Sequence, residues 1–395
     1  MKIKIQLILY LILFVNTANA GVIKLDTIIN LDTKYESSKI KISSFKSNLY
    51  SIYKSTNDSI YFQMLNLDTY SKRYFTLATE NSESEFNWLP QGFGLNDKWL
   101  VVGWSKLIIV YFKMNDKWVY KYMHKFKENR SFLQFKLIND AVFMGEVYPR
   151  SNNKNKASIF TFNLRNKKIE KEFNPYFRGI EYTYFAPNKF IDFNDNGSKT
   201  LISQTLDYKI DIYNDSFELE YTLKKSKGEW QSIDTTELIT MRDEFKIKKV
   251  GPMNRIERLR QSFRSNSDIM RKVQFLNDSM IIAFYSPSNK THKKDMAYDI
   301  WIFKNNKWIL KYNKLVDGFP NMNAKFTYDN FLFAGLYSDF IFLNNNIYSL
   351  KFEFASADVL MQVNKTYGEI FKEMDEFFIE NDLEFRLFIY KLNLE

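Results

Sequence analysis

Apolar residues recur along most of this chain in short runs that either alternate with polar residues or continue without interruption. The runs are rich in Ile, Val, Phe and Tyr, and clusters of Asn, Asp, Ser and Gly separate them. This pattern predicts short β-strands joined by turns almost throughout. The two clearest units each contain three consecutive strands, at Trp99–Gly103, Leu107–Met114 and Trp118–His124, and again at Met280–Tyr285, Tyr298–Phe303 and Trp308–Tyr312.

One turn recurs with nearly the same side chains around it. The sequence Asn115-Asp116-Lys117-Trp118-Val119-Tyr120-Lys121-Tyr122 reappears as Asn305-Asn306-Lys307-Trp308-Ile309-Leu310-Lys311-Tyr312. A repeat of this kind is typical of architectures built from copies of one small unit. Residues that follow comparable turns lie about 40–50 positions apart, with one interval about twice as long, at Tyr74, Trp118, Ile169, Phe217, Trp308 and Ile347.

Units of this length with three or four strands resemble the blades of the β-propeller superfamily. The resemblance covers residues 49–354, and Asn-Asp pairs that begin at Asn57, Asn96, Asn139 and Asn277 fit the same frame. It implies an all-β fold with six or seven blades. The alternative is an irregular two-sheet β protein whose Asn-rich turns coincide by composition.

Three further segments complete this architecture. Residues 251–272 carry apolar side chains near helical spacing and predict a helical insertion, and residues 357–380 predict a C-terminal helix. Residues 225–272 hold either this insertion or a degenerate seventh blade. A strand at Leu383–Leu392 follows the C-terminal helix, and a closed ring needs a strand from the other terminus, which either Ile23–Asn30 or Lys39–Ser43 supplies.

The N-terminus has the features of an export signal. Lys2 and Lys4 precede an apolar run from Ile5 to Val15, and Ala18-Asn19-Ala20 forms a small-x-small cleavage site. We therefore expect residues 1–20 to be a signal peptide cleaved after Ala20, residues 21–395 to form a single propeller domain, and the protein to be periplasmic or secreted. No later segment predicts a transmembrane span. The chain contains no Cys, so its stability depends on buried apolar surface.

Arginine is concentrated in one part of a lysine-rich chain. The net charge is +10, or +8 without Lys2 and Lys4, and six of the Arg residues lie within 242–271. Guanidinium groups bind carboxylate, sulfate or phosphate with two hydrogen bonds, which ammonium groups do not. The insertion is therefore the first candidate for a contact with an anion or a partner, and a solvated helix face is the alternative. The residues proposed for binding are Arg255, Arg258, Arg260 and Arg264.

Two other segments have side chains suited to binding. Asp192, Asn194 and Asn196 alternate before Gly197, and this spacing resembles the calcium loops of EF-hand and FG-GAP repeats. Thr200 and Ser203 stand where those loops place a carboxylate, so the alternative is an ordinary hairpin turn that needs no cofactor. An aromatic cluster with Arg178, Tyr182 and Tyr184 suits a carbohydrate or peptide groove, or equally the packing between blades.

Several kinds of chemistry are excluded by composition. Only His124 and His292 are present, which rules out a multi-histidine metal site, and the absence of Cys rules out thiol catalysis. No glycine-rich nucleotide-binding loop is present. We expect a non-catalytic protein that binds a protein or glycan partner and does not bind nucleic acid. A carbohydrate-active enzyme with paired carboxylates in the central depression is the alternative. The identity of the ligand and the oligomeric state are left open.

Overall fold

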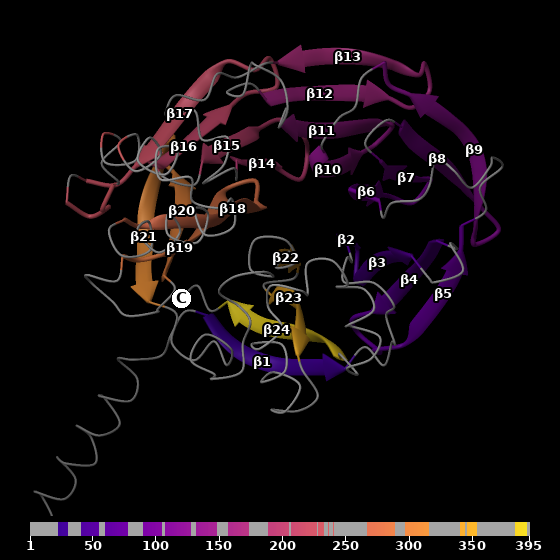
Figure 1. Cartoon of the computed structure of the whole chain (residues 1–395), viewed down its shortest axis with the longest axis horizontal. Coiled ribbons are helices and arrows are strands. Elements are labelled where there is room, and N and C mark those ends of the chain that lie inside the picture. The colour runs from indigo at the N-terminus through magenta and orange to yellow at the C-terminus, as the bar shows by residue number, and fades with distance from the viewer. Residues whose placement is uncertain are drawn as a thin grey trace, which may run out of the picture.

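The described part of the chain folds as a ring of six small β-sheets around a central axis (Figure 1). The computed structural model describes residues 23–30, 41–54, 60–77, 90–104, 107–127, 132–147, 157–173, 189–204, 207–226, 228–232, 236, 240, 267–288, 297–315, 340–343, 346–353 and 384–392. Each sheet is four-stranded and antiparallel, and its first strand lies nearest the axis. The predicted fold class, a β-propeller, is confirmed.

The blades are numbered here in chain order. Blade 1 contains β2 (Lys41–Phe45), β3 (Asn48–Lys54), β4 (Ile60–Asn66) and β5 (Lys72–Thr76); blade 2 contains β6 (Gly92–Leu95), β7 (Trp99–Gly103), β8 (Leu107–Met114) and β9 (Lys117–Lys125); blade 3 contains β10 (Phe132–Ile138), β11 (Ala141–Val147), β12 (Ala157–Asn163) and β13 (Lys168–Phe173). Blade 4 contains β14 (Lys189–Phe193), β15 (Thr200–Gln204), β16 (Asp207–Tyr213) and β17 (Leu219–Lys224); blade 5 contains β18 (Ile269–Asn277), β19 (Met280–Ser286), β20 (Ala297–Lys304) and β21 (Lys307–Leu315). Blade 6 contains β22 (Phe340–Leu343), β23 (Asn346–Glu353), β24 (Glu384–Leu392) and β1 (Ile23–Asn30).

The hydrophobic cores lie between blades, which explains the two kinds of strand pattern. In the middle of blade 2, all of β7 and the first five residues of β8 are buried, because neighbouring blades cover both faces of the sheet. In contrast, exposed and half-buried residues alternate along most of the outer strand β9. Continuous apolar runs in the sequence therefore correspond to the second and third strands of a blade, and alternating runs correspond to the outer, fourth strand.

The N-terminal strand closes the ring. β1 pairs with β24 in antiparallel register from Ile23 opposite Leu392 to Asn30 opposite Arg386, so the first strand in sequence becomes the outer strand of the last blade. Of the two segments that the sequence offered for closure, Ile23–Asn30 is the correct one. Lys41–Phe45, which overlaps the other, begins blade 1.

The repeated turn joins the third and fourth strands of blades 2 and 5. Asn115, Asp116, Asn305 and Asn306 all have positive φ angles, as the two central residues of a type I′ turn require. Asn and Asp adopt this conformation more readily than other non-glycine residues. The matched tryptophans have like surroundings, since Trp118 packs against blade 1 and Trp308 packs against blade 4.

The segment between β17 and β18 is an insertion and not a seventh blade. Blades 4 and 5 pack directly against each other, and Leu201 and Ile210 of blade 4 share a core with Val273 and Ile281 of blade 5. The predicted helical insertion extended too far, because residues 269–272 begin strand β18. Ile269 and Met270 are buried there, and their spacing fits either a helix or a strand. Residues 251–266 and the predicted C-terminal helix at 357–380 lie outside the described residues.

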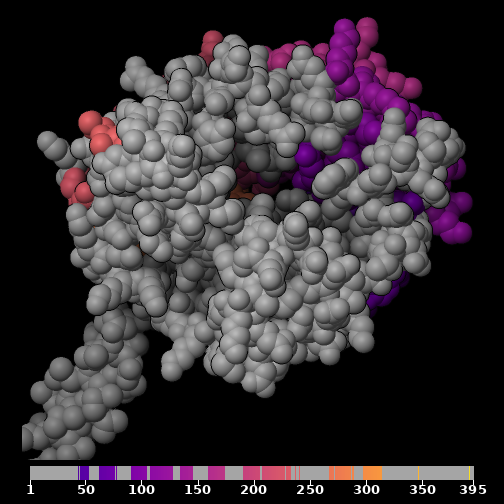
Figure 2. Space-filling model, in the orientation of Figure 1, coloured from indigo at the N-terminus to yellow at the C-terminus, as the bar shows by residue number. Residues whose placement is uncertain are grey.

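The connections divide between the two faces of the ring. Because consecutive strands are antiparallel, turns between first and second strands and between third and fourth strands share one face, here called the short-turn face. Connections within the middle of a blade and between blades share the other, here called the long-connection face. The segments 148–156, 174–188, 225–268, 287–296 and 354–383 all join strand ends on the long-connection face. The space-filling view shows a hollow at the centre of the ring, and atoms of blades 2 and 3 lie along the outer edge of the molecule (Figure 2).

Candidate functional site

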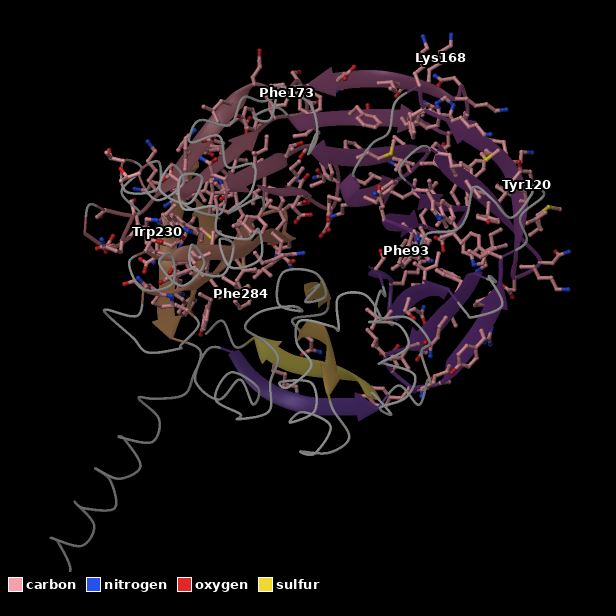
Figure 3. The ribbon with its side chains drawn as sticks, in the orientation of Figure 1. Phe93, Tyr120, Lys168, Phe173, Trp230 and Phe284 are labelled. Carbon is pink, nitrogen blue, oxygen red and sulfur yellow. The ribbon has the colours of Figure 1, made fainter. Side chains whose placement is uncertain are left out.

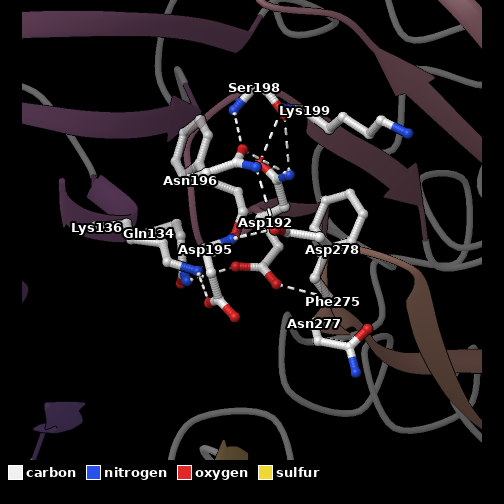
Figure 4. A network of polar contacts seen from close by, with 12 residues as sticks. Gln134, Lys136, Asp192, Asp195, Asn196, Ser198, Lys199, Phe275, Asn277 and Asp278 are labelled. Carbon is white, nitrogen blue, oxygen red and sulfur yellow. Dashed lines mark hydrogen bonds and ion pairs between the residues drawn. The ribbon is translucent and has the colours of Figure 1, made fainter. Parts of the chain in front are cut away.

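The loop that resembles a calcium site forms the turn between β14 and β15. The Asn194 side-chain oxygen accepts a hydrogen bond from the Lys199 backbone N–H at 2.8 Å, and the Asn196 side-chain oxygen accepts one from the Ser198 backbone N–H at 2.8 Å. The Asn194 amide group donates to the Asn196 oxygen at 3.0 Å. The two amide side chains therefore form hydrogen bonds within the turn (Figure 4), and the metal-binding role of Asp192, Asn194 and Asn196 stays a prediction.

Asp192 lies beneath this turn and joins three blades. Its carboxylate accepts a hydrogen bond from Gln134 Nε2 of β10 at 2.9 Å and another from the Phe275 backbone N–H of β18 at 2.7 Å. The side chain is buried, and this burial raises the pKa of Asp192 above its ordinary value, against the opposing effect of Lys136. In the described part of the chain, no group of three or more His, Cys, Asp or Glu side chains is placed to hold a metal ion.

Asn-Asp turns link neighbouring blades around the short-turn face. In each of four cases, the Asp of one blade accepts a hydrogen bond or ion pair from the preceding blade. Lys46 Nζ contacts Asp97 at 2.7 Å, Trp99 Nε1 donates to Asp140 at 2.8 Å, Lys136 Nζ contacts Asp195 at 2.8 Å, and Asn196 Nδ2 donates to Asp278 at 3.1 Å. The pairs that begin at Asn96, Asn139 and Asn277 therefore connect blades, as does Asn194-Asp195, a role that sequence reasoning missed, whereas Asn57-Asp58 lies outside the described residues.

Replacing Asp192 with Asn tests this role. The D192N variant is expected to lose about 1–3 kcal/mol of unfolding free energy, because each hydrogen bond ends on a different oxygen of Asp192 and the NH2 group of an Asn cannot replace one of them as an acceptor. Since burial raises the native pKa of Asp192, this group stabilises the fold most at acid pH, and its contribution falls as the pH rises through that pKa. Urea unfolding at several pH values should show the difference in unfolding free energy from the wild type narrowing as the pH rises above about 4. A penalty that grows with pH would contradict the assignment.

A buried ion pair joins blades 4 and 5 near the long-connection face. Lys225 Nζ lies 2.9 Å from Asp299 Oδ2, and the two side chains are 1% and 0% exposed. The Lys225 ammonium also donates to the Tyr285 hydroxyl at 2.7 Å and lies 4.1 Å from the centre of that ring. The Tyr208 hydroxyl accepts a hydrogen bond from Trp301 Nε1 at 2.9 Å. Charged and aromatic side chains of both blades thus form one interface cluster.

Asp268 holds two connections together beside this cluster. One carboxylate oxygen of Asp268 accepts a hydrogen bond from the Gln231 backbone N–H at 2.8 Å, and the other accepts one from the Ser288 backbone N–H at 2.7 Å. The Asp268 N–H in turn donates to the Gln231 carbonyl at 2.8 Å. All three residues lie at the ends of the segments 232–267 and 287–296. The Arg-rich insertion and the loop of blade 5 therefore begin at the same point on the long-connection face.

The candidate binding residues lie in segments between described strands, and the residues themselves are outside the described part of the chain. Arg255, Arg258, Arg260 and Arg264 lie between β17 and β18, outside the described residues, and Arg178, Tyr182 and Tyr184 lie between β13 and β14, also outside them. Both segments join strand ends on the long-connection face. Asp192, Asn194 and Asn196 belong to the opposite face.

The buried carboxylates within the described residues have structural partners. Asp192 and Asp268 accept backbone hydrogen bonds, Asp299 pairs with Lys225, and Asp211 accepts a hydrogen bond from Thr222 Oγ1 at 2.6 Å. Each therefore has a role in packing. These described residues form no helix that is long and apolar enough to cross a bilayer.

Comparison with known proteins shows a shared fold without a shared family. No family model matches the chain, and no curated protein matches its sequence. A protein of Bacteroides fragilis, whose description proposes that it is exported, is similar in structure with a TM-score of 0.52 and 13% identity, over 94% of this chain and 96% of that one. A member of the DUF4221 family from Bacteroides vulgatus has a TM-score of 0.52 and 9% identity, over 93% and 98% of the two chains. The chain therefore has the same fold as these proteins over nearly its full length.

Proposed function

We propose that this protein is an exported, non-catalytic β-propeller that binds a protein or glycan partner with anionic groups through its long-connection face. The proposal rests on the two backbone hydrogen bonds that Asp268 accepts from Gln231 and Ser288. These bonds hold the ends of the segment 232–267, which contains the Arg-rich insertion, next to the start of the loop at 287–296. Two segments that begin at one point are suited to act on one ligand.

Charge along the chain supports an anionic ligand. Residues 245–266 contain seven basic side chains and one acidic side chain, and residues 287–296 contain three basic side chains and one acidic side chain. Residues 232–244, the first part of the same insertion, contain four acidic side chains and one basic side chain, so the segments 232–267 and 287–296 together carry +5 of the mature chain's +8. An excess of this kind at one place on a surface attracts anionic partners and increases their rate of association.

The aromatic segment between β13 and β14 extends the proposed surface. Tyr182 and Tyr184 offer stacking faces for a sugar ring or a peptide, and Arg178 offers a bidentate contact for a carboxylate, sulfate or phosphate. The strand ends that bound this segment lie on the same face as the insertion. The opposite face directs its Asn-Asp side chains to neighbouring blades, which leaves them less available for a ligand.

Export is part of the proposal. The signal-like segment at 1–20 ends just before β1, which starts at Ile23, so cleavage after Ala20 leaves the closing strand intact. We infer a periplasmic or secreted location on this basis. N-terminal sequencing of the protein recovered from its host checks it, and a mature N-terminus beyond Ile23 would contradict it.

Charge reversal in the insertion tests the binding surface. The variant R255E/R258E/R260E is expected to keep its melting temperature and to lose at least about tenfold in affinity, because each Arg contact with an anionic group is charge-assisted. The measurements are binding to arrays of sulfated, carboxylated and neutral glycans, and recovery of host envelope proteins after crosslinking.

The matched control is K304E/K307E/K311E, which makes the same change of charge at exposed positions of the blade 5 rim. Equal binding by the insertion variant and the wild type would reject the surface, as would an equal loss in the control. Release of sugars from a panel of polysaccharides by the purified protein would replace the binding function with the carbohydrate-active alternative.

A further inference from the structure

Exposed apolar side chains are concentrated at one end of the outer strands. In the described part of the chain, the large hydrophobic residues classed as exposed all lie in a turn between third and fourth strands or within three residues of one. They are Tyr70, Tyr74, Met114, Val119, Ile169, Leu219 and Ile309. Single exposed apolar residues need no explanation, but a position shared by five blades does. These residues place apolar groups around the rim of the short-turn face.

Most of these exposed apolar side chains lie on three adjacent blades, and the same three blades carry a net positive charge beside them. Tyr70 and Tyr74 belong to blade 1, Met114 and Val119 to blade 2, and Ile169 to blade 3, with exposed fractions from 38% to 54%. The hairpin ends at 66–74, 113–121 and 163–170 contain eight basic and three acidic side chains, a net charge of +5. We call these three ends the basic rim. Figure 3 shows Lys168 pointing outward from it.

The corresponding end of blade 4 has the opposite charge. Residues 213–220 contain Asp215, Glu218 and Glu220 and no basic side chain. The basic rim therefore stops at blade 3. Blade 5 again carries a basic hairpin, but it lies opposite blade 2 in the ring of six, with blade 4 on one side.

We propose that the basic rim docks on the surface of an anionic lipid bilayer. Isolated Tyr, Met, Val and Ile side chains separated by Lys and Arg are the composition of interfacial membrane contacts, in which apolar groups enter the headgroup region and ammonium groups meet anionic lipid. The ends of three adjacent blades reach a flat surface together when the ring leans towards blade 2. In that orientation, the acidic end of blade 4 and the whole of blade 5 are lifted from the surface.

The details of the basic rim favour lipid over a folded protein. Lys113 Nζ lies 5.9 Å from the Trp118 ring centre and 3.3 Å from Asp116 Oδ1, and Lys167 Nζ lies 4.6 Å from the Tyr122 ring centre, so both ammonium groups lie beside aromatic side chains. The exposed apolar side chains come from three separate blades with basic residues between them. A protein interface instead concentrates its energy in one compact, desolvated centre.

The repeated hairpin provides a matched pair of variants. K113E/K117E/K121E changes the basic rim, and K304E/K307E/K311E makes the same change of charge on the hairpin of blade 5. Lys307 and Lys311 match Lys117 and Lys121 in the repeat, and Lys304 lies opposite Lys307 at the end of that hairpin. Sedimentation of the mature chain with vesicles of phosphatidylcholine and roughly 30% phosphatidylglycerol, at about 0.1 M salt, measures binding. We expect the blade 2 variant to lose at least about tenfold in partitioning and the blade 5 variant to change less than about twofold, since each lysine near an anionic surface contributes about fivefold.

A second variant tests the apolar side chains. Y74S/M114S/I169S keeps the charge of the basic rim and is expected to lower partitioning several-fold, whereas I309S on blade 5 should leave it unchanged. Circular dichroism and melting curves confirm that each variant folds. Absence of wild-type binding to the anionic vesicles, equal binding to pure phosphatidylcholine, or equal losses in the two lysine variants would overturn the proposal. Crosslinking of the basic rim to an acidic protein, with no vesicle binding, would assign this surface to that partner.

The vesicle measurement is independent of the proposed binding function. R255E/R258E/R260E changes the long-connection face and is expected to bind vesicles as the wild type does. A loss of vesicle binding in that variant would place the lipid contact in the insertion and would overturn the assignment to the basic rim.

Discussion

A chain that begins at residue 33, and therefore lacks β1, is expected to unfold at a temperature at least about 10 °C below that of the mature protein and with a broader transition. β1 pairs with β24 from Ile23 to Asn30 and is the only described segment that joins the N-terminus to blade 6. Without it, β24 becomes an open edge, and the hydrogen bonds that close the ring are lost. Differential scanning calorimetry measures the melting temperature and the width of the transition, and binding of an apolar dye measures the surface exposed when the ring is open.

Adding the missing strand back as a peptide distinguishes loss of the β1–β24 pairing from other effects of shortening the chain. A synthetic peptide with the sequence of residues 21–32 should restore much of the lost melting temperature to the truncated chain, with a dependence on peptide concentration. A peptide of the same composition in scrambled order should not. If the truncated chain melted like the mature protein, the closure seen in the register of β1 and β24 would have no energetic role.

The repeated hairpin shows why the fold could be predicted from the sequence. A type I′ turn needs positive φ at two residues, which restricts its sequence, and the outer strand that follows it packs one Trp against the preceding blade. These local requirements leave a readable pattern at Asn115-Asp116 and Asn305-Asn306. The same reasoning failed at Ile347, which lies in the second strand of blade 6 and not after a turn to the fourth. That blade takes its fourth strand from the N-terminus, so it has no such turn.

The contacts of the candidate site could not be predicted in the same way. Asp192 meets Gln134 and Phe275, which stand 58 and 83 positions away, and nothing in the local sequence distinguishes this role from that of an ion ligand. The pairing of Lys225 with Asp299 likewise depends on how blades 4 and 5 pack. Sequence periodicity determines the strands, but side chains between blades meet only through tertiary structure.

Replacing Lys225 with Met is expected to cost about 3–5 kcal/mol of unfolding free energy, the second of the two largest effects. The substitution leaves Asp299 buried between blades 4 and 5 without its cation, and an uncompensated buried charge is strongly destabilising. Burial raises the pKa of Asp299 above its ordinary value, and the attraction of Lys225 opposes this without cancelling it. Denaturant unfolding of the two proteins at neutral pH gives the difference.

The double variant K225M/D299L distinguishes loss of a charge partner from loss of packing. Because it removes both charges and keeps apolar volume, it should recover most of the stability that K225M loses. The K225M deficit should also shrink in acid. Removal of Lys225 raises the native pKa of Asp299 further, and a group with a raised native pKa stabilises the fold at low pH and loses that contribution as the pH rises. If the double variant were as unstable as K225M at every pH, the cluster would depend on the lysine stem packed against Tyr208 and Tyr285, and the ion pair would contribute little to holding the two blades together.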